Sequence, residues 1–156
     1  MLHYAEAGLS YREVPNEVSL CLYISGYQNH CIECHYHMLN NPEFGDVLSE
    51  HYKNLVDLYL SQITCVCFLG EGNNTESEHN EFGHMVQHLN SLGLKSCLYC
   101  GRDTNIECWM HIFDYVKIGS YKAKFGGLDK RTTNQKMYKK TDCGYVDITY
   151  EFQRDF

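Results

Sequence analysis

The sequence predicts an α/β domain built on a mostly parallel sheet. The first observation is that apolar runs of strand length alternate along the chain with segments of helical periodicity. The second is that expected strands end at glycines, as the run ITCVCFL ends at Gly70. The third is size, because 156 residues, 44% of them hydrophobic and 21% charged, suit one folded domain with a substantial core. Alternating strands and helices are typical of parallel sheets whose crossovers are helical.

The expected elements follow one another in chain order. Residues 18–25, VSLCLYIS, are rich in β-branched and aromatic residues and predict a buried strand, with residues 11–14 as a candidate partner across Pro15. Apolar residues at helical spacing predict helices over 46–60 and from about 77 to 92. The remaining expected elements are strands at 63–69, 95–100 and 114–118 and a short helix at 105–111.

Composition indicates one domain and limits its partners. We expect a single domain over 1–156, with a core at about 13–138 and a polar C-terminal tail at 139–156. The net charge of -7 argues against a general nucleic-acid binder, because phosphate binding needs clustered Lys and Arg. No run approaches eighteen apolar residues, and the first residues do not resemble a secretion signal, so we expect a cytoplasmic protein without a membrane span.

Cysteine is abundant for a cytoplasmic protein. Nine cysteines in this setting favour metal binding, redox chemistry or burial over disulfides. Cys21, Cys65 and Cys67 lie within apolar runs, so we expect them to be buried as small hydrophobic side chains. Cys31 and Cys34 instead lie in a loop directly after the first expected strand. Ligands of parallel sheets gather at the carboxyl ends of the strands, so this loop lies where the architecture predicts a site.

The loop SGYQNHCIECHYH, residues 25–37, has two conventional interpretations. Cys31, Cys34 and the following histidine match the C-x-x-C-H pattern of covalent haem attachment, which requires export and a small helical fold that this sequence does not indicate. A four-thiolate zinc site would add Cys97 and Cys100. However, Cys97 lies in an expected strand, where neighbouring side chains point to different faces.

A third interpretation includes Tyr27. With cysteine in place of Tyr27, the loop would read C-x3-C-x2-C, which is the spacing of the radical S-adenosylmethionine enzymes. In those enzymes three thiolates hold a [4Fe–4S] cluster, and the open iron binds S-adenosylmethionine. An electron from the cluster cleaves the sulfonium to a 5′-deoxyadenosyl radical, a reaction that the cofactor rather than a side chain carries out.

The chain resembles the activating proteins of anaerobic ribonucleoside-triphosphate reductase, small members of the radical S-adenosylmethionine superfamily. The resemblance runs from about Glu13 to Tyr138 and rests on EVPNEVSLCLYISGYQNHCIECH, TCVCFLGEG, GLKSCLYCGRD, FDYVKIGSY and GGLDKRTTNQKMY. It implies a shortened, open radical S-adenosylmethionine partial barrel. It also implies a glycyl-radical activase that abstracts hydrogen from a glycine of the large reductase subunit, with a reductant such as flavodoxin.

The resemblance also implies which residues bind the cofactors. Cys31 and Cys34 would ligate the cluster, and Tyr27 occupies the position of the missing third ligand. Iron–sulfur clusters are held by thiolates, whereas a phenolate is a hard oxygen donor. Two alternatives therefore stay open: a non-catalytic or impaired relative that binds the reductase without a competent cluster, and a small zinc-binding domain.

For S-adenosylmethionine the implied residues follow the second and third expected strands. The turn at 70–72 is where the family binds the amino group of the cofactor, with Asn73 as a helper. Arg102 would reach the ribose or carboxylate, and Asp103 either joins it or caps a helix. The complete implied set is Gly70, Glu71, Gly72, Asn73 and Arg102.

Overall fold

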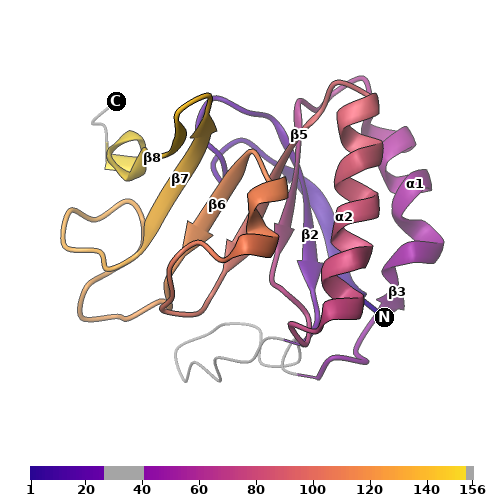
Figure 1. The fold of residues 1–156 in the computed structure, drawn as a ribbon, viewed down its shortest axis with the longest axis horizontal. Helices are drawn as coiled ribbons and strands as arrows, with labels where there is room; N and C mark the ends of the chain where they lie inside the picture. Colours follow the sequence, from indigo (N-terminus) through magenta and orange to yellow (C-terminus); the bar gives the residue numbers. More distant parts are fainter. Residues whose placement is uncertain (27–40, 154–156) are drawn as a thin grey trace.

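An open sheet covered by two α-helices on one face forms the protein (Figure 1). The computed structural model describes residues 1–26 and 41–153. Within them the sheet has eight strands in the order β3-β1-β2-β4-β5-β6-β7-β8. The strands are β1 (His3–Ser10), β2 (Ser19–Ile24), β3 (Asp46–Val47), β4 (Cys65–Leu69), β5 (Lys95–Cys100), β6 (Tyr115–Ile118), β7 (Lys136–Thr141) and β8 (Gly144–Asp147). The helices are α1 (Leu48–Tyr59), α2 (Glu76–Ser91) and the 3-10 helices η2 (Cys108–Ile112) and η3 (Thr149–Gln153).

Parallel pairing is confined to the centre of the sheet. Strands β2, β4, β5 and β6 pair in parallel, and α1, α2 and η2 lie in the connections between them. At one end β1 pairs antiparallel with β2 and β3, and at the other β7 pairs antiparallel with β6 and β8. The prediction of a mostly parallel sheet therefore holds for the centre only. Short connections such as the turn between β7 and β8 join antiparallel neighbours, whereas parallel neighbours need a long crossover.

The four central strands and both α-helices confirm the elements predicted from apolar runs and helical spacing. The predicted helix over 46–60 begins later, because Asp46–Val47 pairs with β1 before α1 starts at Leu48. The short helix predicted over 105–111 is the 3-10 helix η2 at Cys108–Ile112.

Four strands at the ends of the sheet, β1, β3, β7 and β8, were not predicted, and two expectations need correction. Residues 11–14 do not pair with β2; β1 does, and the chain turns where the Glu17 amide donates to the Val14 carbonyl. Residues 139–153 are not a polar tail, because they complete β7 and form β8 and η3. These outer strands consist mostly of half-buried and exposed residues, so their sequences lack the apolar runs of the central strands.

The two faces of the sheet are buried differently. Helices α1 and α2 cover one face and bury Tyr52, Val56, Phe82 and Leu89 against it. The opposite face carries no α-helix in the described chain and packs beneath residues such as Val14 and Ile148. Burial of Cys21, Cys65 and Cys67, as predicted, is confirmed: all three lie on this second face and are at most 3% exposed.

Neither α-helix of the described chain, α1 or α2, combines the length and apolarity that crossing a bilayer requires.

Candidate functional site

The carboxyl ends of the parallel strands meet at one edge of the sheet. There the backbone of Gly26, which follows β2, lies against the backbone of Gly72, which follows β4. Gly70 lies equally close to the end of β2, since a Cβ on it would be 3.1 Å from the Ile24 carbonyl oxygen. Glycine is required here because Gly26, Gly70 and Gly72 all have positive φ angles and have backbone or side chains where a Cβ would extend.

Substituting Gly26 by alanine tests this contact. Gly26 has φ +96° and its new Cβ would lie 2.9 Å from the carbonyl carbon of Gly72. We expect the free energy of unfolding to fall by about 2 kcal/mol, from backbone strain and overpacking together. The matched control is Gly144→Ala, at φ +106° with nothing within 4 Å of the added Cβ, which should cost only the strain of about 1 kcal/mol. Urea unfolding measures both, and equal losses would contradict the close approach.

The cysteine loop is attached at this edge. The described chain stops at Gly26 and resumes at Asn41, and the Ser25 hydroxyl donates a 2.6 Å hydrogen bond to the Phe44 carbonyl. Tyr27, Cys31 and Cys34, the predicted cluster position and ligands, lie outside the described residues. What the structure describes is therefore the base of the loop, which adjoins the Gly70–Gly72 turn.

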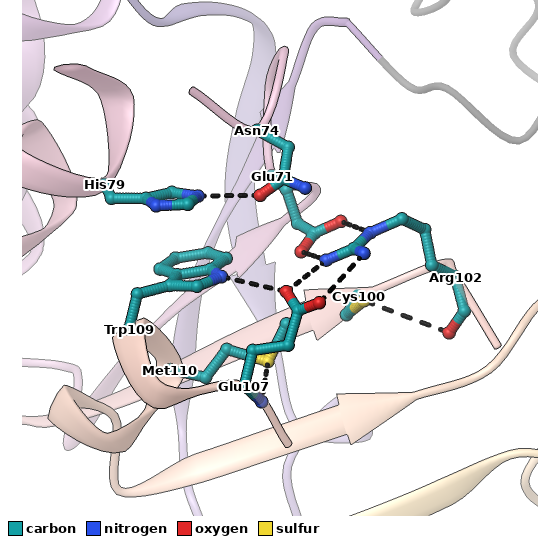
Figure 2. Close-up of polar contacts among 8 residues, drawn as sticks. All are labelled: Glu71, Asn74, His79, Cys100, Arg102, Glu107, Trp109 and Met110. Atoms are coloured by element: carbon teal, nitrogen blue, oxygen red, sulfur yellow. Dashed lines mark hydrogen bonds and ion pairs between the residues drawn. The ribbon is translucent and has the colours of Figure 1, made fainter. Parts of the chain in front are cut away.

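Arg102 is the centre of a charged cluster at the same edge (Figure 2). Its Nε and Nη2 each donate to the Glu71 carboxylate at 2.8 Å, in a two-pronged ion pair. Its Nη1 and Nη2 donate to the Glu107 carboxylate at 3.2 and 2.6 Å. Glu71 is 8% exposed and Arg102 26%, so water screens the pair with Glu71 only weakly.

The cluster continues from Glu107 into aromatic contacts. The Trp109 Nε1 donates to Glu107 at 3.1 Å, which fixes the indole ring beside the carboxylate. The His79 ring stacks on that indole, with ring centroids 3.9 Å apart and planes 6° from parallel. His79 Nε2 is 2.6 Å from the Asn74 side-chain oxygen. Figure 2 shows that one connected set of side chains thus joins the turn after β4, the first turn of α2, the loop after β5 and η2.

The N-terminus of α2 is held to the same turn. Thr75 is the N-cap residue, and its hydroxyl accepts from the Glu78 amide. The Glu78 carboxylate, 2% exposed, accepts a 2.7 Å hydrogen bond from the backbone amide of Asn73. The predicted cofactor helper Asn73 is therefore tied through its backbone to a buried carboxylate.

Electrostatics of the cluster follow from these contacts. Hydrogen bonds from Arg102 hold the pKa of Glu107 below its usual value. Burial lowers the pKa of His79, so its imidazole favours the neutral form at pH 7. Burial, with the nearby Glu71 charge, raises the pKa of the Cys100 thiol to about 12. The cluster therefore carries two carboxylates, one guanidinium, a neutral imidazole and a protonated thiol.

Two of the predicted cofactor residues, Arg102 and Glu71, bind each other. Four of the five N–H donors of Arg102 go to Glu71 and Glu107, so its guanidinium positions protein carboxylates. Asp103 caps no helix. It accepts from the backbone and hydroxyl of Ser120 at 2.9 Å, and so joins the loop after β5 to the loop after β6.

Two of the four cysteines of the zinc alternative, Cys97 and Cys100, are described, and their thiols do not point to a common site. Cys97 belongs to the core of the second face, whereas Cys100 belongs to the core under the helices, so the two thiols lie on opposite sides of β5. This is the strand geometry that the sequence predicts. Within residues 1–26 and 41–153, no three His, Cys, Asp or Glu side chains are grouped closely enough to hold a metal ion.

Sequence reasoning missed His79, Glu107 and the polar role of Trp109. Trp109 and Met110 also pack in the core, since Met110 is fully buried and the Trp109 ring packs against Phe113. No local pattern signals that Glu107 and His79, 28 positions apart in the sequence, both contact Trp109. Glu107 accepts a hydrogen bond from its indole nitrogen, and His79 stacks on its ring. Their contacts arise only because α2 and η2 lie side by side on the sheet.

Comparison with known proteins returns no relative. No protein-family model matches the chain. No curated protein and no solved structure matches it either. The function is therefore inferred from the residues of this chain.

Proposed function

We propose that the protein is a radical S-adenosylmethionine activase that generates a glycyl radical on an anaerobic ribonucleoside-triphosphate reductase. One observation supports this most directly: the loop that contains Cys31 and Cys34 starts at Gly26, whose backbone lies against the Gly72 turn. The chain that leads to the predicted cluster ligands therefore leaves the sheet beside the turn where the cofactor would bind. The open sheet with four central parallel strands is consistent with a shortened partial barrel.

The residues fit the cofactors unequally. The turn at Gly70 and Gly72 follows β4 and has no side chains at its two glycines, which would let its backbone come close to the amino group of S-adenosylmethionine. Cys31 and Cys34 suit iron as thiolates, with Tyr27 as the third position. When bound, the two groups supply one-electron reductive cleavage of the sulfonium. Arg102 would act as a positioning residue that holds Glu71, and hence the turn, in place.

A second candidate is a relative that binds the reductase without catalysis. Tyr27 at the position of a thiolate ligand favours it, since two thiolates leave a cubane cluster under-coordinated. The engagement of Arg102 with protein carboxylates also favours it, because that guanidinium has little capacity left for a ligand.

Reconstitution without oxygen tests the proposal and separates the two candidates. The protein, Tyr27→Cys and Tyr27→Phe are each incubated with iron, sulfide and reductant, and then assayed for iron content, electron paramagnetic resonance and 5′-deoxyadenosine. We expect Tyr27→Cys to bind about four iron ions per chain and to change its spectrum when S-adenosylmethionine is added.

The unmodified protein compared with Tyr27→Phe shows whether the phenol oxygen is a ligand. Iron binding and cofactor cleavage by the unmodified protein that are lost in Tyr27→Phe support the activase with Tyr27 as ligand. Cleavage by Tyr27→Cys alone supports the impaired relative. A Tyr27→Cys protein that takes up neither iron nor sulfide contradicts both the cluster and the activase.

A further inference from the structure

Three buried cysteines lie opposite one another on adjacent parallel strands. The register pairs Cys21 of β2 with Cys67 of β4, and Cys67 with Cys97 of β5. All three are free thiols on the sheet face opposite α1 and α2. We refer to Cys21, Cys67 and Cys97 as the thiol row.

The cysteines of the row face one another across adjacent strands, because directly paired residues of a sheet point their side chains to the same face. Neighbouring strands lie about 4.8 Å apart, which falls within the Cα separation of roughly 4.4–6.8 Å that a disulfide spans. The backbone of the sheet therefore holds the Cα atoms of both cysteine pairs at a separation that a disulfide can span.

We propose that the thiol row is an oxidation site, in which Cys67 forms a disulfide with Cys21 or with Cys97 when the protein meets a peroxide. This inference does not depend on the proposed function. It concerns only cysteines of β2, β4 and β5.

The reaction has two balanced steps. The peroxide oxidises one thiol of the row to a sulfenic acid and is reduced to one water molecule. The facing thiol then attacks the sulfenic sulfur, which forms the S–S bond and releases a second water. The two thiols lose two electrons and two hydrogen atoms in total, and the peroxide accepts both electrons.

Burial slows the oxidation of the thiol row, and the shared position of Cys67 limits it to one disulfide per molecule. Burial raises the pKa of Cys67 well above its ordinary value, so the reactive thiolate is scarce and oxidation is slow compared with that of an exposed cysteine. Because Cys67 is the shared member of both pairs, each molecule forms one of the two disulfides and never both.

Cys65 provides a matched control within the same strand. It lies two residues before Cys67 on the same face and is equally buried at 0% exposed. Its register partners are Ser19 and Lys95, so no thiol lies directly opposite it.

The test treats the folded full-length protein with hydrogen peroxide, denatures it in N-ethylmaleimide, and maps linked peptides by tandem mass spectrometry. We expect peptides joined through Cys67 to Cys21 or Cys97, each about 2 Da lighter than the separate thiol peptides. Cys65→Ser should keep these links and Cys67→Ser should lose both. Cys21→Ser and Cys97→Ser, which each remove one partner, should redirect the link to the other partner.

Exposed Cys108 reports that the oxidant has acted. If Cys67 is still recovered only as the maleimide adduct after peroxide treatment is extended well beyond the time that fully oxidises Cys108, the proposal is overturned. It is equally overturned if the same pairs of peptides are still joined in Cys67→Ser, which would place the link on another cysteine, or if Cys65→Ser abolishes the link.

Discussion

Replacing Arg102 by methionine lowers the free energy of unfolding by about 3 kcal/mol. The physical reason is that Glu71 is only 8% exposed and would lose the guanidinium that now binds its carboxylate through two hydrogen bonds. Glu107 would lose the same partner. Removing one member of a buried ion pair costs more than the pair contributes, because the remaining charge is left desolvated. Urea unfolding followed by circular dichroism at pH 7 measures the loss.

An exposed ion pair of this chain provides the control. Lys130 and Asp129 are 65% and 68% exposed, so Lys130→Met should change stability by less than about 1 kcal/mol. The double variant Arg102→Met with Glu71→Gln should recover part of the loss, because it removes the uncompensated charge. If Arg102→Met costs no more than Lys130→Met, the cluster does not stabilise the edge of the sheet.

The loss of stability in Arg102→Met should become smaller in acid. Arg102 lowers the pKa of Glu107 below its ordinary 4.5, so the folded state binds fewer protons there than the unfolded state. The stability that this interaction contributes is present above about pH 4.5 and is lost as the pH falls through the lowered pKa. The difference between the unmodified protein and Arg102→Met should therefore narrow below pH 4.5. A difference that stays constant into acid would exclude a charge-based cause.

Replacing Lys117 by methionine raises stability at pH 7. Lys117 is 7% exposed on β6, and within residues 1–26 and 41–153 it forms no ion pair. Burial lowers its pKa from 10.5 to about 8. That change corresponds to roughly 3 kcal/mol of destabilisation when the amine is charged. Methionine fills a similar volume but loses the 2.6 Å hydrogen bond to the Gly119 carbonyl, so we expect a net gain of about 1–2 kcal/mol.

The pH dependence gives a second signature of the same group. Between about pH 8 and 10.5 the unfolded chain keeps the Lys117 proton while the folded protein releases it. The stability of the unmodified protein should therefore rise with pH across this window, relative to Lys117→Met. Exposed Lys95, at the start of β5, is the control, and Lys95→Met should reproduce neither effect. One outcome would contradict this. If Lys117→Met is less stable than the unmodified protein at pH 7, and the stability difference between the two proteins does not change between about pH 8 and 10.5, then Lys117 is paired with an anionic group.

The central strands and the α-helices were predictable because their burial produces local patterns of apolar residues in the sequence. The run CVCFL of β4 is apolar because that strand is covered on both faces, and α2 shows its buried stripe through Phe82, Val86 and Leu89. Strands β1, β3, β7 and β8 were not predicted, because each is partly exposed. Their pairing depends on which edge of the finished sheet is free, and no local pattern carries that information.

For the candidate site, the amino-acid sequence by itself determined where the unusual residues lie: glycine turns follow the parallel strands, and Tyr27, Cys31 and Cys34 follow the first of them. Only the tertiary structure decided what Arg102 binds. The partners of a guanidinium are chosen by distance and desolvation, and Glu71 and Glu107 reach it from different loops only after the sheet and η2 have assembled. The thiol row has the same origin, since cysteines at 21, 67 and 97 become neighbours through strand register alone.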